Sequence, residues 1–197
     1  MTSFRQKALR FFYPLLMKGS KWAGNRAAVI ENKEGQLFQT PIYDLTVTLN
    51  NGRVVPLRNW QGRKLLLVNT ASDCGYTEQY RELQQLQNRY ANKVQVLAFP
   101  SNDFKNQEPA SDATIAQFCQ QNFGVTFPLV TKSRVVKSTQ QHPVYQWLTQ
   151  PHKNGWNDKA PSWNFSKYLI NEHGVLTHYF DPGVSPLSDE VVQAITV

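Results

Sequence analysis

Cysteine is scarce in this chain, since Cys74 and Cys119 are the only two among 197 residues. Two widely separated cysteines exclude the disulfide framework of a small secreted domain. They also do not form the C-x-x-C motif of thiol–disulfide oxidoreductases. Four histidines are present, but none has metal-ligand spacing with either cysteine. We therefore expect no metal site and no bound cofactor.

Long apolar runs are also missing. No stretch reaches the roughly 18 apolar residues that a membrane-spanning helix needs, so we expect no such helix. The chain has no internal repeat or low-complexity tract. Its content of 41% hydrophobic and 18% charged residues is that of an ordinary globular domain. The expectation from these absences is one compact domain in a cytoplasmic protein.

Acidic residues are absent from the first 30 positions, where six basic residues precede Glu31 and supply most of the net charge of +7. The remainder of the chain has 15 basic and 14 acidic residues and is nearly neutral. A nucleic-acid-binding domain would gather basic residues on its folded surface, so we expect no nucleic-acid partner. We divide the chain into a basic N-terminal extension, residues 1–36, and one domain, residues 37–197.

The N-terminal extension carries an apolar face at helical spacing within residues 4–22. The members of this face are Phe4, Ala8, Phe11, Phe12, Leu15 and Trp22. Basic residues flank the face, which is the composition of an interfacial helix attracted to anionic lipid. A secretory signal is not indicated, because the apolar stretch 11–17 is short and contains Pro14. A disordered tail and a helix packed against the domain are the alternatives to peripheral membrane contact.

The domain alternates short apolar runs with helical patterns. Asn50-Asn51-Gly52 between two alternating segments predicts a β-hairpin. Ser111 is the expected N-cap of a helix over 112–121. Further strands are expected at 64–69, 94–99, 127–131, 168–170 and 175–180, and further helices at 78–91, 142–148 and 188–195. This order predicts an α/β, thioredoxin-like fold with a central mixed sheet flanked by helices and an N-terminal β-hairpin.

Cys74 lies between the buried strand 64–69 and the helix that follows it. Free N–H groups at a helix N-terminus stabilise an anion, so this position favours a reactive thiolate. Gly75 allows the backbone to approach closely at the same point. A buried structural cysteine is the alternative, because a free cysteine often behaves as a small hydrophobic residue.

The residues around Cys74 resemble the peroxidatic segment of glutathione peroxidases. Val68 to Tyr80 matches the family pattern V-N-x-A-S-x-C-G-x-T-x-x-Y, and Phe99 to Pro109 is similar to F-P-x-N-x-F-x-x-Q-E-P. Gly124 to Pro128 and Trp163 to Leu169 match two further blocks. The resemblance runs from about Pro41 to the C-terminus in the order and spacing of that family.

This resemblance implies an active site made of Cys74, Gln107, Trp163 and Asn164. The thiolate attacks a hydroperoxide and becomes a sulfenic acid, while water or an alcohol departs. Amide and indole N–H groups are neutral donors that can hold a thiolate and orient the peroxide. Two alternatives remain open, since Gln107 could instead cap the following helix and Trp163 could belong to the core.

Some residues depart from the family pattern. Asp73 stands where relatives usually have a basic residue, and its carboxylate should disfavour the thiolate unless it turns away as a helix cap. Lys105 and Asn106 replace a pair that usually contains glycine. Trp156-Asn157 is a second Trp-Asn pair, but it lacks the following motif and its neighbours indicate a loop.

Cys119 occupies the position of the resolving cysteine in relatives that use thioredoxin. The resemblance therefore implies that Cys119 reduces the sulfenic acid, with thioredoxin as the preferred reductant and glutathione as the other candidate. The residues alone favour simple packing, because Cys119 shares an apolar helix face with Ile115 and Phe118. A helical and distant Cys119 would react only after local unfolding.

The function implied by the resemblance is a monomeric thiol peroxidase for hydrogen peroxide and organic or lipid hydroperoxides. A peroxide sensor that passes oxidation from its cysteines to a partner protein would have the same sequence features, and it is the alternative.

Overall fold

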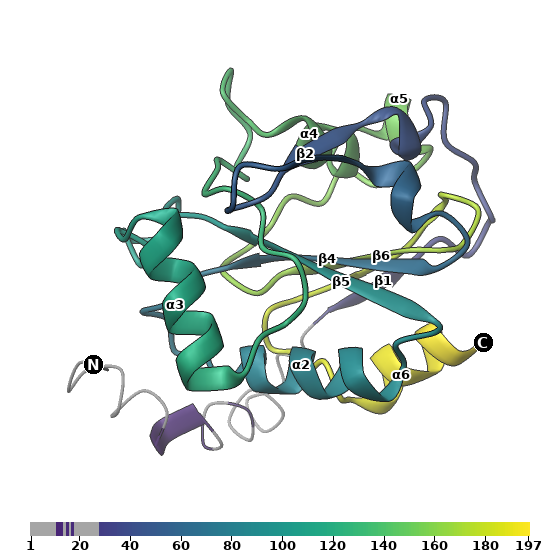
Figure 1. Cartoon of the computed structure of the whole chain (residues 1–197). Coiled ribbons are helices and arrows are strands. Elements are labelled where there is room, and N and C mark those ends of the chain that lie inside the picture. Colours follow the sequence, from purple (N-terminus) through teal and green to yellow (C-terminus); the bar gives the residue numbers. More distant parts are fainter. Residues whose placement is uncertain (1–10, 14, 16, 18–27) are drawn as a thin grey trace.

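The computed structural model describes residues 11–13, 15, 17 and 28–197 (Figure 1). A five-stranded sheet in the order β1-β7-β6-β4-β5 forms its centre. The strands β4 and β5 are parallel and the other pairs are antiparallel, so the sheet is mixed, as predicted. The strands are β1 (Val29–Glu31), β4 (Lys64–Thr70), β5 (Val94–Pro100), β6 (Lys167–Ile170) and β7 (Leu176–Phe180).

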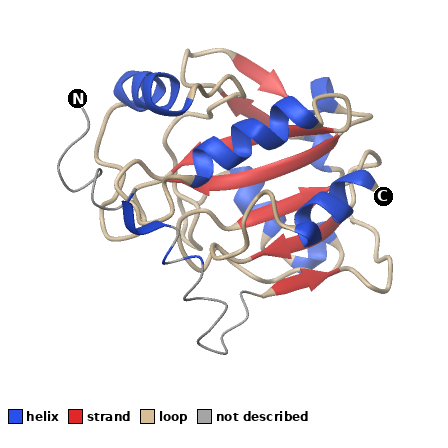
Figure 2. Cartoon of the chain, turned by 90° about the horizontal axis from the view of Figure 1, so that it is seen from below, coloured by secondary structure: helices blue, strands red, loops and turns tan. Residues whose placement is uncertain are grey.

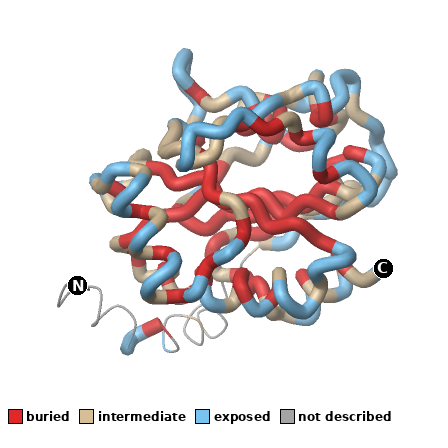
Figure 3. The backbone as a smooth tube through the Cα atoms, viewed as in Figure 1, coloured by how far each residue is buried: buried red, intermediate tan, exposed pale blue. Residues whose placement is uncertain are grey.

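The apolar run of β4 explains its central position, because all seven of its residues are buried. Alternate side chains enter opposite layers: Leu66 packs in one apolar cluster and Leu67 in the other. Figure 1 shows α2 and α6 on one side of the sheet and α4, α5 and β2 on the other. The buried parts of the chain run through the middle of the molecule (Figure 3).

Helices cover both faces of this sheet. Seen from the α2 side, the helices of that face cross in front of the strands and the other helices lie behind them (Figure 2). The first layer contains the helices α2 (Gln79–Arg89), α3 (Asp112–Phe123) and α6 (Asp189–Thr196). The second layer contains the helices α4 (Pro143–Leu148) and α5 (Pro151–Asn154) and the 3-10 turns η1 (Ile42–Asp44) and η2 (Leu57–Trp60). This arrangement is the thioredoxin-like α/β fold that the sequence predicted.

The predicted hairpin is formed by β2 (Thr46–Thr48) and β3 (Val54–Pro56), with Gly52 at a φ of 83° in the turn. Helix α3 begins as predicted, because the Ser111 side chain accepts a hydrogen bond from the Thr114 N–H at 3.3 Å. Gly124 ends α3 in the left-handed conformation. Gln107 therefore does not cap this helix.

Two segments differ from the sequence predictions. Residues 127–131 form no regular strand, because only Leu129 and Val130 make isolated bridges, to Ala98 and Leu49 respectively. Pro128 lies within this segment and lacks a backbone N–H, which limits ladder formation. The short strand β1 was not predicted, since its three residues carry no readable alternation, yet it pairs with β7.

The first residues described belong to the N-terminal extension. Tyr13 is buried, and its hydroxyl donates to Glu82 Oε1 of α2 at 2.8 Å. Phe11, Phe12 and Leu15 are exposed at 76%, 52% and 61%. The other members of the predicted apolar face, at positions 4, 8 and 22, lie outside the described residues. Within the described part of the chain, no helix has the length and apolar character to cross a membrane.

Candidate active site

The turn between β4 and α2 holds Cys74. Thr77 fixes this turn, because its Oγ1 accepts the Cys74 N–H at 3.1 Å and lies 2.8 Å from the Cys74 carbonyl oxygen. The Thr77 N–H also donates to the Cys74 carbonyl at 3.1 Å. Helix α2 itself begins only at Gln79, and no side chain caps it. Asp73 is therefore not the cap of this helix, which corrects one of the sequence alternatives.

The Cys74 sulfur is buried and faces neutral donors. The Tyr76 N–H donates to Sγ at 3.5 Å, and the side chains of Asn164 and Trp163 act as further neutral donors that lower the pKa of the thiol. Burial raises the pKa of the Cys74 thiol, and these donors offset part of that rise. The Asp73 carboxylate raises the same pKa further, in the direction expected from sequence. The stabilising N–H comes from the turn, not from the first residues of α2.

The Trp163-Asn164 segment is fixed to the end of β4 by Asn69. Asn69 Nδ2 donates to the Trp163 carbonyl at 3.0 Å, and the Phe165 N–H donates to the Asn69 carbonyl at 2.6 Å. Phe165 has a φ of 69°, a conformation that costs energy in a residue other than glycine. These contacts hold Asn164, which is fully buried, against Cys74.

Gln107 joins the site through Asn164. The Asn164 Nδ2 donates to Gln107 Oε1 at 2.9 Å, and the Asp73 N–H donates to the Gln107 carbonyl at 3.1 Å. The structure thus brings together all four residues that the resemblance assigned to the active site. Gln107 and Trp163 are half-buried, so the donor groups around the buried sulfur reach the surface of the protein.

The loop before Gln107 is strained beside this site. Lys105 and Asn106 have φ values of 50° and 52°, at the pair of positions where relatives usually have a glycine. Lys105 Nζ lies 5.6 Å from the ring centre of Trp163, and Phe104 packs on the same ring at 5.4 Å. Trp163 is therefore held between its own segment and this loop, and it also packs, partly buried, against the first apolar cluster.

The second Trp-Asn pair lies elsewhere. Trp156 Nε1 donates to the Leu176 carbonyl at 2.7 Å, and Asn157 Nδ2 donates to the Leu148 carbonyl at 2.6 Å. Trp156 packs with the second apolar cluster, whereas Cys74 belongs to the first. The pair therefore has a structural role, as the sequence indicated.

Cys119 is a free thiol on α3, buried in the same apolar cluster as Cys74. Ile115 is buried beside it and Phe118 is partly buried, so packing is part of its role. Burial raises the pKa of Cys119 to about 12, and the Tyr80 hydroxyl offsets a small part of that rise. Cys119 lies within an intact helix and must leave this position to meet an oxidised Cys74.

Sequence reasoning missed Asn69 and also Lys167, a second residue that positions the site. Lys167 is fully buried in β6, and its Nζ donates to Gln79 Oε1 at 2.8 Å and to the Phe165 carbonyl at 2.6 Å. The ammonium group thus connects the start of α2 to the segment that carries Asn164. A lysine within an apolar strand pattern was the signal, because fully buried lysines are rare unless they are paired.

Comparison with known proteins agrees with this geometry. The family described as glutathione peroxidase matches residues 42–149. The glutathione peroxidase homolog BsaA of Bacillus subtilis is 37% identical over 157 residues, covering 78% of this chain and 98% of that protein. The glutathione peroxidase-like peroxiredoxin gpx1 of Schizosaccharomyces pombe is 44% identical over 133 residues, covering 67% and 83%.

Solved structures give the same result. The crystal structure of T. cruzi GPX1 superposes with a TM-score of 0.60 at 31% identity, covering 79% of this chain and 93% of that one. A thioredoxin family thiol:disulfide interchange protein from Chlorobium tepidum has a TM-score of 0.58 at 12% identity, which shows the fold alone. The chain belongs to the glutathione peroxidase family and is a thiol peroxidase with a thioredoxin-like fold.

Proposed function

We propose that Cys74 is the residue that attacks the hydroperoxide, assisted by Gln107, Trp163 and Asn164. The observation that supports this assignment is the set of neutral N–H donors around one buried sulfur. No positive charge is needed to hold the thiolate, because several oriented dipoles act together in a site largely closed to water.

The proposed reaction begins with the Cys74 thiolate. Its sulfur forms a bond to the distal peroxide oxygen while the O–O bond breaks. Cys74 becomes a sulfenic acid, and the departing oxygen takes up a proton to leave as water or an alcohol. The amide of Gln107 and the indole N–H of Trp163 lie at the half-buried edge of the site, where they can orient the peroxide. Hydrogen peroxide and organic or lipid hydroperoxides are the proposed substrates.

We further propose that Cys119 resolves the sulfenic acid by forming a disulfide with Cys74. Both thiols are free and lie in one apolar cluster, so opening one end of α3 is the motion required. Thioredoxin is the preferred reductant of this disulfide, and glutathione is the other candidate. The working unit is a monomer.

Two variants test this function. Cys74→Ser should abolish hydrogen peroxide consumption in stopped-flow measurements, because a neutral hydroxyl cannot replace a thiolate. Cys119→Ser should keep the first oxidation of Cys74 but stop turnover with thioredoxin. Peroxide consumption that survives in Cys74→Ser contradicts the assignment of Cys74.

The second variant also separates the alternatives for Cys119. Full thioredoxin-driven turnover in Cys119→Ser means that Cys119 only packs in the core. Rapid oxidation of the wild type without turnover by either thioredoxin or glutathione favours the peroxide sensor instead.

The N-terminal segment is proposed to contact anionic lipid. Phe11, Phe12 and Leu15 are exposed, while Tyr13 between them is anchored to Glu82 of α2. Six basic residues accompany these apolar side chains in the first 30 positions. The hydrogen bond from Tyr13 attaches the segment to α2, the helix that follows the turn of Cys74. Membrane contact there would present lipid hydroperoxides to the enzyme.

A further inference from the structure

The ammonium group of Lys167 is fully buried, and its four hydrogen-bond partners are all neutral oxygens. Two of them are Gln79 Oε1 and the Phe165 carbonyl, at 2.8 and 2.6 Å. The other two are the carbonyls of Asp181 and Pro182 after β7, each at 3.4 Å. Burying a charge is costly, and lysine is almost never fully buried unless it is paired. This arrangement therefore requires an explanation.

One partner of Lys167 leads back to the Cys74 sulfur through the turn. Gln79 is the first residue of α2, and its N–H donates to the Tyr76 carbonyl at 2.9 Å. The Tyr76 N–H in turn donates to Cys74 Sγ at 3.5 Å. The side chain of Gln79 is held a second time, because its Nε2 donates to the Pro182 carbonyl at 2.6 Å. Lys167 therefore fixes the residue that supports the N–H donor of this turn.

A second partner leads to the amide donors of the site. The Phe165 carbonyl accepts from Lys167 and the Phe165 N–H donates to Asn69, so this left-handed residue is held on both sides. Asn164 comes directly before it, and the Asn164 side chain donates to Gln107 Oε1 at 2.9 Å. A strained backbone persists only where its surroundings enforce it. The bond from Lys167 thus helps to determine where Asn164 lies relative to β6.

The two remaining partners attach the loop after β7 to the same group. The Asp181 carbonyl accepts from Lys167, and the Asp181 carboxylate accepts from the Ser162 hydroxyl at 3.2 Å. Ser162 comes directly before Trp163 in the sequence. Three segments that are far apart in the chain therefore meet at one ammonium group, and all three are bonded to residues of the candidate active site.

We propose that Lys167 is a positioning residue for attack on the hydroperoxide, because its ammonium group fixes the turn of Cys74 and the segment of Asn164 relative to one another. This inference rests on the role proposed for Cys74. An ammonium group has three protons and no acceptor, so it can bind oxygens of several segments at once. Preorganised donors lose much of their effect when they are misplaced by about 1 Å, so fixing both donor sets supports the rate of oxidation.

Lys167→Met tests the proposal, because methionine fills much of the space but donates no hydrogen bond. Stopped-flow oxidation of Cys74 by hydrogen peroxide should slow by about tenfold. The pH profile of this rate should move to higher pH, since the donors that favour the thiolate are no longer held in place.

Lys64→Met is the matched control. It removes a second buried lysine that donates to two carbonyls, but these carbonyls belong to Ala194 and Ile195 in α6. The rate of Cys74 oxidation and its pH profile should stay at their wild-type values in this variant. If Lys64→Met slows oxidation as much as Lys167→Met does, the effect is a general loss of stability and the proposal is overturned.

A double-mutant cycle separates positioning from the simple loss of a charge. In an Asn164→Ala background, Lys167→Met should slow oxidation by no more than about threefold, because the amide that Lys167 positions is already absent and only the turn of Cys74 is affected. Equal slowing in the presence and absence of Asn164 overturns the proposal.

Lys167→Gln serves as the second variant if Lys167→Met does not fold. Glutamine keeps an N–H donor but is too short to hold both Gln79 and Phe165, so oxidation should slow and the pH profile should move in the same direction. Wild-type rates and an unchanged profile in the Lys167 variant that folds overturn the positioning role alone. Peroxide consumption that survives in Cys74→Ser overturns the role of Cys74 and this inference with it.

Discussion

The Cys74 sulfur is surrounded by groups that carry dipoles, while the nearest influential charge is negative. Tyr76, Trp163 and Asn164 supply N–H donors, whereas the Asp73 carboxylate acts against the thiolate. Burial raises the thiol pKa, so the thiolate fraction and the rate of oxidation should increase as the pH rises. Burial and the neutral donors therefore set the reactivity of Cys74, and the charge of Asp73 opposes formation of the thiolate.

Asp73→Asn should lower the pKa of Cys74 and accelerate its oxidation at neutral pH by about two- to fivefold, since a repulsive charge is removed. The pH profile of the second-order oxidation rate should shift to lower pH. Asp44→Asn is the control, because Asp44 is an exposed carboxylate paired with Arg58. A rate that falls, or a profile that does not move, contradicts the electrostatic role of Asp73.

Asn164→Ala should slow oxidation of Cys74 by about tenfold or more, because it removes a donor to sulfur and the partner of Gln107. Gln107→Ala and Trp163→Phe should have smaller effects in the same direction. Asn157→Ala is the matched control from the second Trp-Asn pair. It should lower the melting temperature and leave the oxidation rate unchanged. Wild-type rates of Cys74 oxidation in Asn164→Ala, Gln107→Ala and Trp163→Phe would place the site elsewhere.

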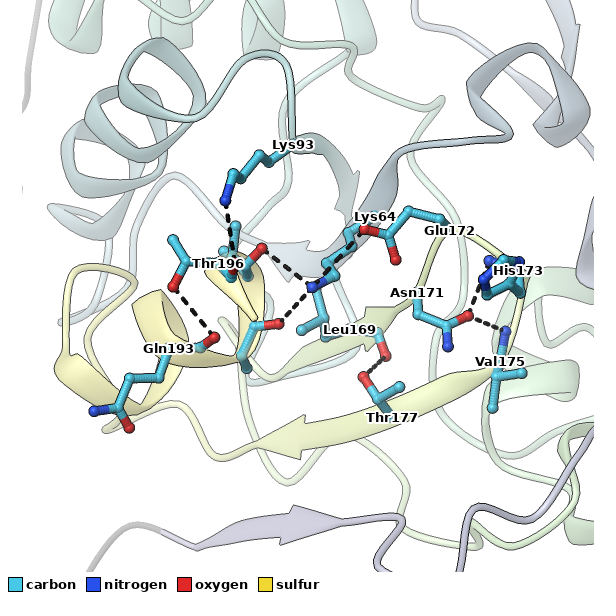
Figure 4. A network of polar contacts seen from close by, with 12 residues as sticks. Lys64, Lys93, Leu169, Asn171, Glu172, His173, Val175, Thr177, Gln193 and Thr196 are labelled. Atoms are coloured by element: carbon cyan, nitrogen blue, oxygen red, sulfur yellow. Dashed lines mark hydrogen bonds and ion pairs between the residues drawn. The ribbon is translucent and has the colours of Figure 1, made fainter.

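Among the secondary-structure elements, helix α6 is attached to the sheet by lysines. Lys64 Nζ donates to the carbonyl oxygens of Ala194 and Ile195 at 3.1 and 3.2 Å, at the C-terminal end of α6. Lys93 Nζ donates to the Thr196 carbonyl at 3.1 Å. Figure 4 shows these contacts together with Glu172 beside Lys64. The positive groups satisfy the last carbonyls and oppose the negative end of the helix dipole.

Lys64→Met should reduce the free energy of unfolding by about 1–3 kcal/mol, because buried carbonyls lose a charged donor. Lys93→Met should have a smaller effect, since Lys93 is exposed and reaches one carbonyl. Urea unfolding of both variants measures the difference. If Lys93→Met reduces the free energy of unfolding more than Lys64→Met does, burial does not determine the strength of these contacts.

The elements with strong local signals were predictable. The apolar run of β4 indicated a central strand, and Ser111 marked the start of α3, which extends two residues beyond the predicted end at 121. Residues 127–131 were assigned wrongly, because an apolar run does not reveal that Pro128 limits pairing to single bridges. The strand β1 has no pattern of its own and exists because β7 offers it an edge.

The candidate site was predictable in its members but not in its connections. Motif resemblance indicated Cys74 and its three donors. It could not indicate that Asn69 and Lys167 hold those donors, because both contacts join residues far apart in the chain. The pairing of Glu108 with Ser72 likewise follows only from tertiary packing.

The whole molecule combines a nearly neutral domain with a basic, partly apolar N-terminal segment. Tyr13 fixes this segment to α2 through its hydrogen bond to Glu82. The Ser185 hydroxyl donates to the other oxygen of the same Glu82 carboxylate at 2.7 Å. Exposed Phe11 and Phe12 are thus carried at a fixed place on the domain. This arrangement suits a surface that docks on anionic lipid.

The full chain should co-sediment with anionic phospholipid vesicles, and a variant lacking residues 1–26 should not. The deletion stops before Ala28, because the Ala28 N–H donates to Asp181 and the next residue begins β1. Replacing both Phe11 and Phe12 with serine should also reduce binding, whereas Tyr13→Ser should loosen the segment from α2 without removing its apolar side chains. Equal partitioning of the full and shortened chains excludes the lipid contact.

The strand β1 and the segment 127–131 share a consequence for the behaviour of the protein at high concentration. The strand β1 covers the outer edge of β7. On the outer edge of β5, the Ala98 N–H donates to the Pro128 carbonyl and the Val130 N–H donates to the Ala98 carbonyl. An uncovered strand edge can pair with another copy of the chain and start aggregation. The three residues of β1 and the segment 127–131 thus cover parts of β7 and β5 that would otherwise be free to pair with another chain.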